Sequence, residues 1–286
     1  MKNGETLLSS NNQTKIDKAV TELDNFLSYL NKKPKPTDAD YEMLYQKYLN
    51  SLTGNNLEYN DSRKADIKAL EEQVEADWEL LVKKPTKQLF EEYYYLDGED
   101  IQPVADSLKR VNNMFIAYFQ ENNKYYHNEQ LYNDAMNAVR WVADVKYAND
   151  IERYGNWYGW MISVPRSLAD TLILTRDTMD KELSEKIMTA ILYRTGGENY
   201  YQIWSGGNRT YLCNVFLKLA VCMKNDKYFR GVTFALQDQC VWGASVNDEA
   251  FLYDGTFSAH KGFVYNSGYG LDLINNSGSF MNMLYG

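Results

Sequence analysis

The spacing of apolar residues limits the fold of this 286-residue chain more than any other feature. Apolar residues recur at intervals of three and four, which is typical of helices with one buried stripe, and the two-residue alternation of strands is rare. The first stripe consists of Ile16, Val20, Leu23, Leu27 and Leu30. Only the segment from Phe251 to Phe257 looks extended. The pattern therefore predicts an all-α protein.

Prolines and capping residues divide the chain into further helices. The Lys-Pro-Lys-Pro run at 33–36 interrupts the first stripe, and Thr37 or Asp38 can cap a helix that extends through Tyr48. A third stripe consists of Ile67, Leu70, Val74, Trp78 and Leu81. Pro103 suits the first turn of the next helix, where a missing N–H matters least. That helix is expected to bury Val104, Leu108, Val111, Phe115 and Tyr118.

The same periodicity continues to residue 240. It predicts helices at 129–148, 165–176, 181–194, 208–224 and 227–240. Short polar or glycine-containing links join these helices, which favours antiparallel hairpins stacked side by side. We therefore expect residues 1–286 to form one all-α domain, an (α/α) toroid or an incomplete barrel of helical hairpins.

Charge and hydropathy limit the partners of the chain. The formal net charge of −9 argues against non-specific attraction to nucleic acid or to an anionic membrane. No segment has the roughly 18 consecutive apolar residues of a membrane-spanning helix. Residues 1–10 also lack the apolar stretch of a signal peptide. We expect a monomer that binds neither nucleic acid nor membrane.

The sequence suggests no metal or cofactor. Cys213, Cys222 and Cys240 lack the spacing of a zinc site or a disulfide framework, so we interpret them as small core residues. The two histidines lie far apart, and no acidic calcium loop is present. The Gly206-Gly207 pair does not have the spacing of a phosphate-binding loop.

Function is expected in the links of residues 154–286, where glycine, asparagine and large rings gather. Three segments stand out: residues 156–160 with Pro165-Arg166, residues 204–209, and residues 254–260 with Gly268-Tyr269-Gly270. Glycine permits close approach of a ligand, and the rings of 24 tyrosines and 6 tryptophans suit stacking on sugars. Any one such turn, taken alone, is more often a helix cap or a packing turn than a binding site.

Together these segments resemble the helical domain of the hyaluronate, chondroitin AC and xanthan lyases, whose N-terminal catalytic domain is an (α/α) toroid. The likeness is clear over about residues 100–286. The order Asn, His, Tyr, with Tyr269 nine positions after His260, is more specific than any single motif. The resemblance implies β-elimination on a uronate-containing acidic polysaccharide of the hyaluronan, chondroitin or xanthan type, outside the cytoplasm in the extracellular space or periplasm.

The resemblance assigns three catalytic residues. Asn208 would donate hydrogen bonds to the uronate carboxylate and stabilise the charge that develops when the neighbouring C5 proton leaves. Tyr269 would act as general base and then as general acid to the leaving oxygen. His260 would either help remove the proton or hold the uronate and tune Tyr269, and the sequence leaves both roles open.

Five further residues are expected to bind substrate: Asn156, Trp157, Tyr158, Trp204 and Arg209. The three rings would stack on sugars, and the amide and guanidinium would bind hydroxyls or carboxylates at neighbouring positions. Trp160 and Trp242 are expected in the core, and His127 in an ordinary turn.

The sequence also departs from the family pattern. Family members carry an arginine farther along the helical domain, followed by β-sandwich domains, whereas no arginine follows Arg230 here. We therefore expect a truncated form of the domain. Two alternatives stay open. One is an inverting glycosidase that uses two of Asp248, Glu249 and Asp254. The other is a carbohydrate-binding module without catalysis.

Overall fold

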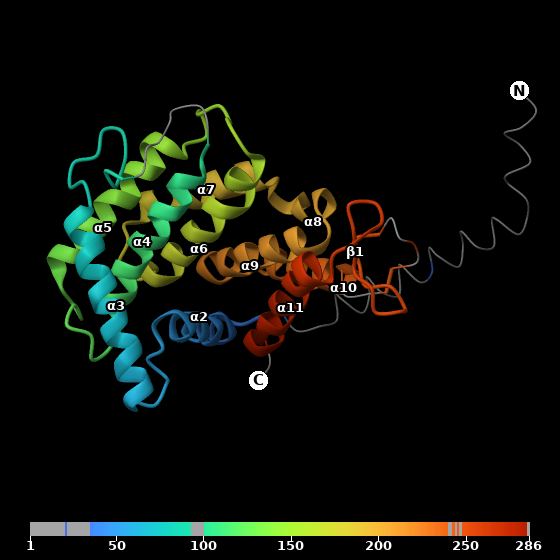
Figure 1. Ribbon diagram of the computed structural model, residues 1–286, viewed down its shortest axis with the longest axis horizontal. Helices are drawn as coiled ribbons and strands as arrows, with labels where there is room; N and C mark the ends of the chain where they lie inside the picture. The colour runs from blue at the N-terminus through green and yellow to red at the C-terminus, as the bar shows by residue number, and fades with distance from the viewer. Residues whose placement is uncertain are drawn as a thin grey trace, which may run out of the picture. The chain divides into compact units, whose positions relative to one another are not determined.

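The computed structural model describes residues 21, 35–92, 100–239, 242, 243, 245 and 248–284 (Figure 1). The chain divides into two compact units, Met1–Thr37 and Asp38–Gly286. The predicted stripe from Ile16 to Leu30 and the predicted core residue Cys240 lie outside the described residues. The site residues expected from the sequence all lie in the second unit, Asp38–Gly286.

The described part of this unit is built almost entirely from helices, so the all-α prediction is confirmed. The α-helices are α2 (Asp38–Thr53), α3 (Asp61–Leu80), α4 (Gln102–Phe119), α5 (Glu129–Trp141), α6 (Val164–Thr175), α7 (Lys181–Thr195), α8 (Tyr200–Ile203), α9 (Gly206–Met223), α10 (Asp226–Gln239) and α11 (Leu271–Leu284). Short π-helical segments are η2 (Val142–Lys146), η3 (Gly159–Ser163) and η5 (Asn266–Gly270), and η4 (Gly197–Asn199) is a 3₁₀ turn. Two short strands, β1 (Ser258–Ala259) and β2 (Phe263–Val264), form an antiparallel hairpin.

Capping residues explain where several helices begin. The side chains of Asn60, Asn128 and Asp180 accept hydrogen bonds from backbone N–H groups in the first turns of α3, α5 and α7. These bonds satisfy donors that have no partner inside a helix. Helix α7 ends at Gly196, which adopts the left-handed conformation common after a helix.

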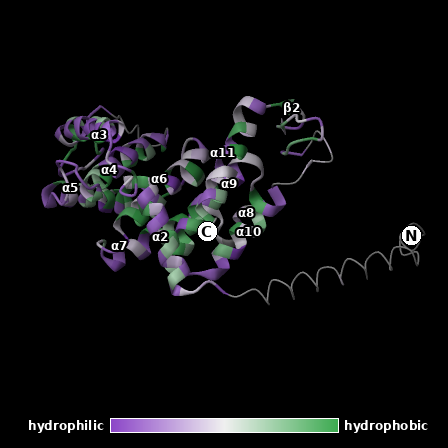
Figure 2. Ribbon diagram, turned by 90° about the horizontal axis from the view of Figure 1, so that it is seen from below, coloured by the Kyte–Doolittle hydropathy of each residue, from purple (hydrophilic) through white to green (hydrophobic). Residues whose placement is uncertain are grey.

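Consecutive helices pack against each other, as the hairpin prediction required. Helix α4 packs on α3 and α5, and α9 packs on α10, while α6 lies against both α4 and α9 (Figure 1). All five residues of the predicted α4 stripe are buried. Helix α3 is hydrophilic over most of its length (Figure 2), whereas α9 buries side chains all round. Helix α9 is therefore the inner helix on which the neighbouring helices are arranged.

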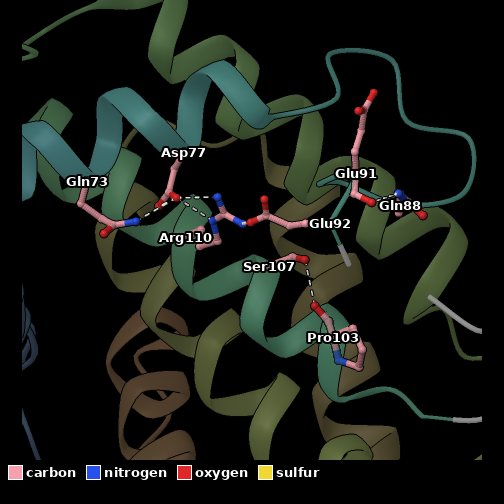
Figure 3. Close-up of polar contacts among 8 residues, drawn as sticks. All are labelled: Gln73, Asp77, Gln88, Glu91, Glu92, Pro103, Ser107 and Arg110. Carbon is pink, nitrogen blue, oxygen red and sulfur yellow. Dashed lines mark hydrogen bonds and ion pairs between the residues drawn. The ribbon is translucent and has the colours of Figure 1, made fainter. Parts of the chain in front are cut away.

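A buried ion pair ties α3 to α4 (Figure 3). Arg110 on α4 donates through Nε to Oδ1 of Asp77 at 2.7 Å, and Gln73 donates to the same oxygen at 2.9 Å. The guanidinium also pairs with Glu92 and lies over the ring of Phe90, 3.9 Å from its centroid. Because Asp77 is only 1% exposed, loss of Arg110 would leave a buried carboxylate without its cation.

The C-terminal part differs from the sequence prediction in two places. The prediction that residues 251–257 are extended was wrong, because residues 253–255 form a tight turn and only Phe251 and Phe257 on either side of it pair in an antiparallel bridge. Helix α11 was not predicted, because its Asn, Ser and Gly residues are weak helix formers. It is held by packing on α9 and α2.

The two tryptophans expected in the core differ in burial. Trp160 is fully buried and donates through Nε1 to the carbonyl of Tyr154 at 2.7 Å, so that prediction is confirmed. The prediction for Trp242 was wrong, since Trp242 is 55% exposed and its ring stacks on that of Tyr253. A large apolar side chain in a link need not reach the core when a neighbouring ring covers one face.

Cys213 is buried as expected, and Cys222 is partly buried. His127 adopts a left-handed backbone conformation in the turn before α5 and contacts the rings of Tyr118 and Tyr126. None of the helices in the described segments combines the length and the apolar character needed to cross a lipid bilayer.

Candidate active site

Two helix N-termini meet beside a stacked pair of tryptophans. Asn156 accepts a hydrogen bond from the backbone N–H of Tyr158 at 3.0 Å and so caps the helical run that begins at Trp157. Helix α9 begins at Gly206, directly after Trp204 and Ser205. The rings of Trp157 and Trp204 stack with 4.3 Å between centroids and 12° between planes. Because helix N-termini carry partial positive charge, this region favours an anion.

A hydrogen-bond network fixes the start of α9 to the loop that precedes the hairpin. The N–H of Gly206 donates to Gln239 at 2.7 Å, and Gln239 donates to the carbonyl of Glu249 at 2.8 Å. The Ser205 hydroxyl donates to the Glu249 carboxylate at 2.8 Å. Gly206 has φ of +60°, a conformation that strains any residue with a Cβ.

Asn208 and Tyr269 share one cavity. Asn208 lies in the first turn of α9, and the cavity has a volume of about 320 Å³. It is lined by Tyr158, Asn208, Tyr211, Tyr265, Gly268, Tyr269 and Asp272. A Cβ on Gly207 would lie 3.2 Å from Cβ of Asp272 and 3.6 Å from Cδ1 of Tyr269. The absence of a side chain at Gly207 therefore lets the start of α11 approach the start of α9.

His260 reaches Tyr269 from the tip of the β1–β2 hairpin. Both His260 and Lys261 have positive φ, at 50° and 64°, a conformation that is uncommon outside glycine and recurs at functional sites. The His260 ring stands at 81° to the Tyr269 ring with 5.1 Å between centroids, and Tyr265 lies 5.9 Å from His260. His260 also lines a second, larger cavity of about 720 Å³.

Tyr269 is held in the short π-helical turn η5. Asn266 at the start of this turn accepts from the N–H of Phe257 at 2.8 Å, and Gly270 at its end lies against the buried Phe257 ring. Burial, followed by the neighbouring Tyr265 and Glu249, raises the pKa of Tyr269 above its ordinary value of 10.0. The phenol is therefore protonated at neutral pH.

The structure adds three residues to this site that the sequence did not suggest. Tyr211, Tyr265 and Asp272 line the cavity with Asn208 and Tyr269. Burial, together with a hydrogen bond to Asp272, raises the pKa of Tyr211 to about 12. Helical spacing could have identified Tyr211, which follows Asn208 by one turn. Asp272 could not be found in this way, because α11 itself was not predicted.

The predicted substrate-binding residues differ in how freely a ligand could contact them. Trp157 is 41% exposed, and Tyr158 lines the cavity. Arg209 donates through Nε to the carbonyl of Trp204 at 2.6 Å and pairs with Asp238, so its guanidinium already holds the link in place. It also borders the second cavity. Substrate binding by these residues stays a prediction.

The three carboxylates considered for a glycosidase each have a local partner. Asp254 accepts from the N–H of Thr256 at 2.9 Å, and this hydrogen bond lowers its pKa. Asp248 accepts from the N–H of Ser245, and Glu249 accepts from Ser205. Within the described residues, no group of three or more His, Cys, Asp or Glu side chains is placed to hold a metal ion.

Known lyases are similar to this chain in sequence. The chain is 24% identical over 196 residues to a xanthan lyase of Bacillus sp. strain GL1, covering 68% of the chain and 21% of the relative. It is 22% identical over 270 residues to a hyaluronate lyase of Enterococcus faecalis, covering 86% of the chain and 26% of the relative. The chain thus spans about a quarter of the length of these curated relatives.

Solved structures of lyases have a fold similar to that of this chain. The xanthan lyase of Paenibacillus matches with a TM-score of 0.77 at 22% identity, over 87% of this chain and 24% of that one. The chondroitin AC lyase of Streptomyces coelicolor in complex with chondroitin sulphate matches with a TM-score of 0.73 at 20% identity, over 86% of this chain and 33% of that one. These matches confirm the predicted (α/α) toroid fold.

The family assignment rests on a longer match than any motif provides. The sequence model described as polysaccharide lyase family 8, N terminal alpha-helical domain, matches residues 48–286. This match includes all three predicted catalytic residues. The chain therefore belongs to polysaccharide lyase family 8, the family that its motifs resemble.

Proposed function

We propose that this chain supplies the catalytic helical domain of a lyase that cleaves a uronate-containing polysaccharide by β-elimination, outside the cytoplasm. The observation that carries the proposal is the meeting of an amide, an imidazole and a phenol. Asn208 and Tyr269 line one cavity, and His260 makes an edge contact with Tyr269. The hyaluronan, chondroitin and xanthan types of polymer are the candidate substrates, in keeping with the family.

The first step needs a way to make the C5 proton acidic. That proton lies next to the uronate carboxylate, whose negative charge opposes the formation of a second one. Hydrogen bonds from the Asn208 amide, at the positive N-terminus of α9, would lower this cost by stabilising the enolate-like charge as it develops. Tyr158 and Tyr211, which line the same cavity, would enclose the sugar ring.

The second step moves one proton and breaks one bond. Tyr269 would remove the C5 proton, the electron pair would form the C4–C5 double bond, and the C4–O bond would break. The same phenol would then return the proton to the leaving oxygen. Because Tyr269 is protonated in the free protein, its own proton must move first, and His260 lies beside it to receive that proton.

Trp157 and Trp204 would determine which glycosidic bond of the polymer lies next to the candidate catalytic residues. The stacked rings of Trp157 and Trp204 present a flat apolar surface at the edge of the site, which suits the face of a sugar. The indole Nε1 of Trp204 is buried and has no hydrogen-bond partner among the described residues. A sugar hydroxyl would accept from this N–H if substrate binding displaced the atoms that cover it.

A product assay tests the proposal. The chain is incubated with hyaluronan, chondroitin and xanthan, and the ultraviolet absorbance of the conjugated double bond is followed. We expect absorbance to rise for the native chain, and to rise at least about 100-fold more slowly for Tyr269→Phe, because general acid–base groups contribute about that much. Tyr193→Phe, an exposed tyrosine on α7, is the matched control.

The alternatives give different outcomes in the same assay. Shortening of the polymer without ultraviolet absorbance would show hydrolysis, as a glycosidase performs. Binding without shortening, equal in the native chain and in Tyr269→Phe, would indicate a carbohydrate-binding module. Either result would overturn the lyase proposal.

A further inference from the structure

Arg166 lies beside the candidate site, and its charge has no carboxylate partner among the described residues. It is an exposed residue in the first turn of α6, and its guanidinium lies over the ring of Tyr211, 4.2 Å from the centroid. Among the described residues, no carboxylate lies within ion-pair distance of Arg166, and no hydrogen bond engages its guanidinium. A guanidinium carries five N–H donors, so these donors are available to a ligand.

Other arginines of the structure are used differently. Arg209 pairs with Asp238, Arg110 with Asp77 and Glu92, and Arg176 with Glu42 and Asp177. Each of these guanidiniums connects two parts of the fold. Arg166 makes no such connection through its charge, because its contact is with a ring face. The charge of Arg166 therefore has no structural partner in the described chain.

Tyr211 places this charge next to the cavity. The Tyr211 ring lines the cavity that holds Asn208 and Tyr269, and its hydroxyl is hydrogen-bonded to Asp272 on α11. Tyr211 is thus held from one side by Asp272 and contacted on its face by Arg166. Stacking on an aromatic ring restricts a guanidinium and lowers the entropy lost when it binds an anion.

An acidic polymer can bind at this site only if a cation offsets the negative charges around it. The chain carries a formal net charge of −9, and the carboxylates of Asp272 and Glu249 lie close enough to raise the pKa of Tyr269. Both would repel an acidic polymer. The positive ends of two helices act only within about one turn, so an anionic group farther along the polymer requires a charged side chain. Arg166 is placed to provide it.

We propose that Arg166 binds a second oxyanion of the polysaccharide, carried either by the sugar next to the uronate that Asn208 would hold or by the next uronate along the polymer. This inference rests on the proposed function and identifies a residue that distinguishes substrates. Carboxylates and sulfates both match the planar fork of a guanidinium, which binds them through two parallel hydrogen bonds. Polymers with acidic groups at regular intervals would present such a group to Arg166, and neutral polymers would not.

Direct binding measurements test this inference without relying on turnover. Tyr269→Phe serves as the parent, so that bound oligosaccharides are not cleaved, and affinities are measured by calorimetry at low salt. The ligands are oligosaccharides of hyaluronan, unsulfated chondroitin and chondroitin sulfate. The added variants are Arg166→Gln and Arg166→Lys. Arg140→Gln, on the exposed pair with Asp180, removes the same charge from α5, which contributes no residue to the cavity lining.

We expect Arg166→Gln to weaken binding about ten-fold or more, as the loss of a charge-assisted hydrogen bond implies. Arg166→Lys should recover part of the affinity, because it keeps the charge and loses the fork. A loss confined to chondroitin sulfate would assign the oxyanion as a sulfate, and an equal loss on all three would assign it as a carboxylate. Equal affinities for Arg166→Gln and Arg140→Gln would overturn the inference.

The proposed function and this inference can fail separately. If the parent binds none of the three oligosaccharides, the substrate class is wrong, and this is visible before Arg166 is changed. If the parent binds them and the native chain produces no double bond, the elimination chemistry fails while the role of Arg166 is still measured. Thermal melts show whether each variant is folded, and Arg166→Lys carries the test if Arg166→Gln melts early.

Discussion

The imidazole of His260 stands almost perpendicular to the phenol of Tyr269, with 5.1 Å between the ring centroids. The two rings come from different elements, the tip of the β1–β2 hairpin and the π-helical turn before α11. Asn266 joins these elements, since it accepts from the N–H of Phe257 and donates to the carbonyl of Gly255. The imidazole–phenol contact therefore depends on the loop as a whole.

The backbone of His260 and its side chain can be tested separately. His260 has φ of +50°, so His260→Gly keeps a conformation that glycine adopts freely, whereas His260→Ala retains the strain. We expect both variants to lose lyase activity, and His260→Gly to be more stable than His260→Ala by about 1 kcal/mol. Urea denaturation and the ultraviolet assay measure the two effects. Activity retained in His260→Gly would remove the imidazole from the mechanism.

Gly207 is predicted to control how closely α11 approaches α9. The new Cβ of Gly207→Ala would crowd Cβ of Asp272 at 3.2 Å, so Tyr269 should shift relative to Asn208. We expect a roughly ten-fold or greater loss of activity, because catalysis is sensitive to such displacements. The matched control is Gly231→Ala on α10, where nothing lies within 4 Å. That change should leave activity intact and stabilise the helix by about 0.5–1 kcal/mol. Equal activities in the two variants would contradict the prediction.

The ion pair between Asp77 and Arg110 is predicted to matter for stability and not for catalysis. Asp77→Ala leaves a partly buried guanidinium without its main partner, which costs about 3 kcal/mol or more. The control is Asp61→Ala, which removes a carboxylate that is 98% exposed and should cost less than about 1 kcal/mol. Urea denaturation gives both free energies of unfolding. Similar losses in the free energy of unfolding for the two variants would show that the buried pair stabilises the fold no more than an exposed carboxylate does.

Alkaline pH should weaken the fold through Tyr211. Burial and the hydrogen bond to Asp272 raise its pKa from 10.0 to about 12, so the folded state keeps a proton that the unfolded state loses. The stabilising effect is complete below pH 10 and disappears as the pH rises toward 12. In Tyr211→Phe the free energy of unfolding should fall less steeply over this range than in the native chain. Parallel pH profiles for the two proteins would contradict the assignment.

The sequence alone determined the helical class, most helix positions and the order of the candidate catalytic residues. Apolar periodicity and first-turn preferences act within one or two turns, so Pro103 could be assigned to the start of α4 from the sequence alone. The same signals failed at α11, whose sequence favours no helix and whose stability comes from packing on α9. Local preference is weak there, and tertiary contact overrides it.

Only the tertiary structure decided which side chains share the cavity. Asp272, Tyr265 and Tyr211 carry no motif of their own, and they gather around Tyr269 because Gly207 lets two helices approach. The exposure of Trp242 and the internal pairing of Arg209 were equally invisible, since each depends on a partner distant in sequence or on a neighbouring ring. Apolar periodicity indicates which face of a helix is buried, but it does not indicate which residues that face packs against.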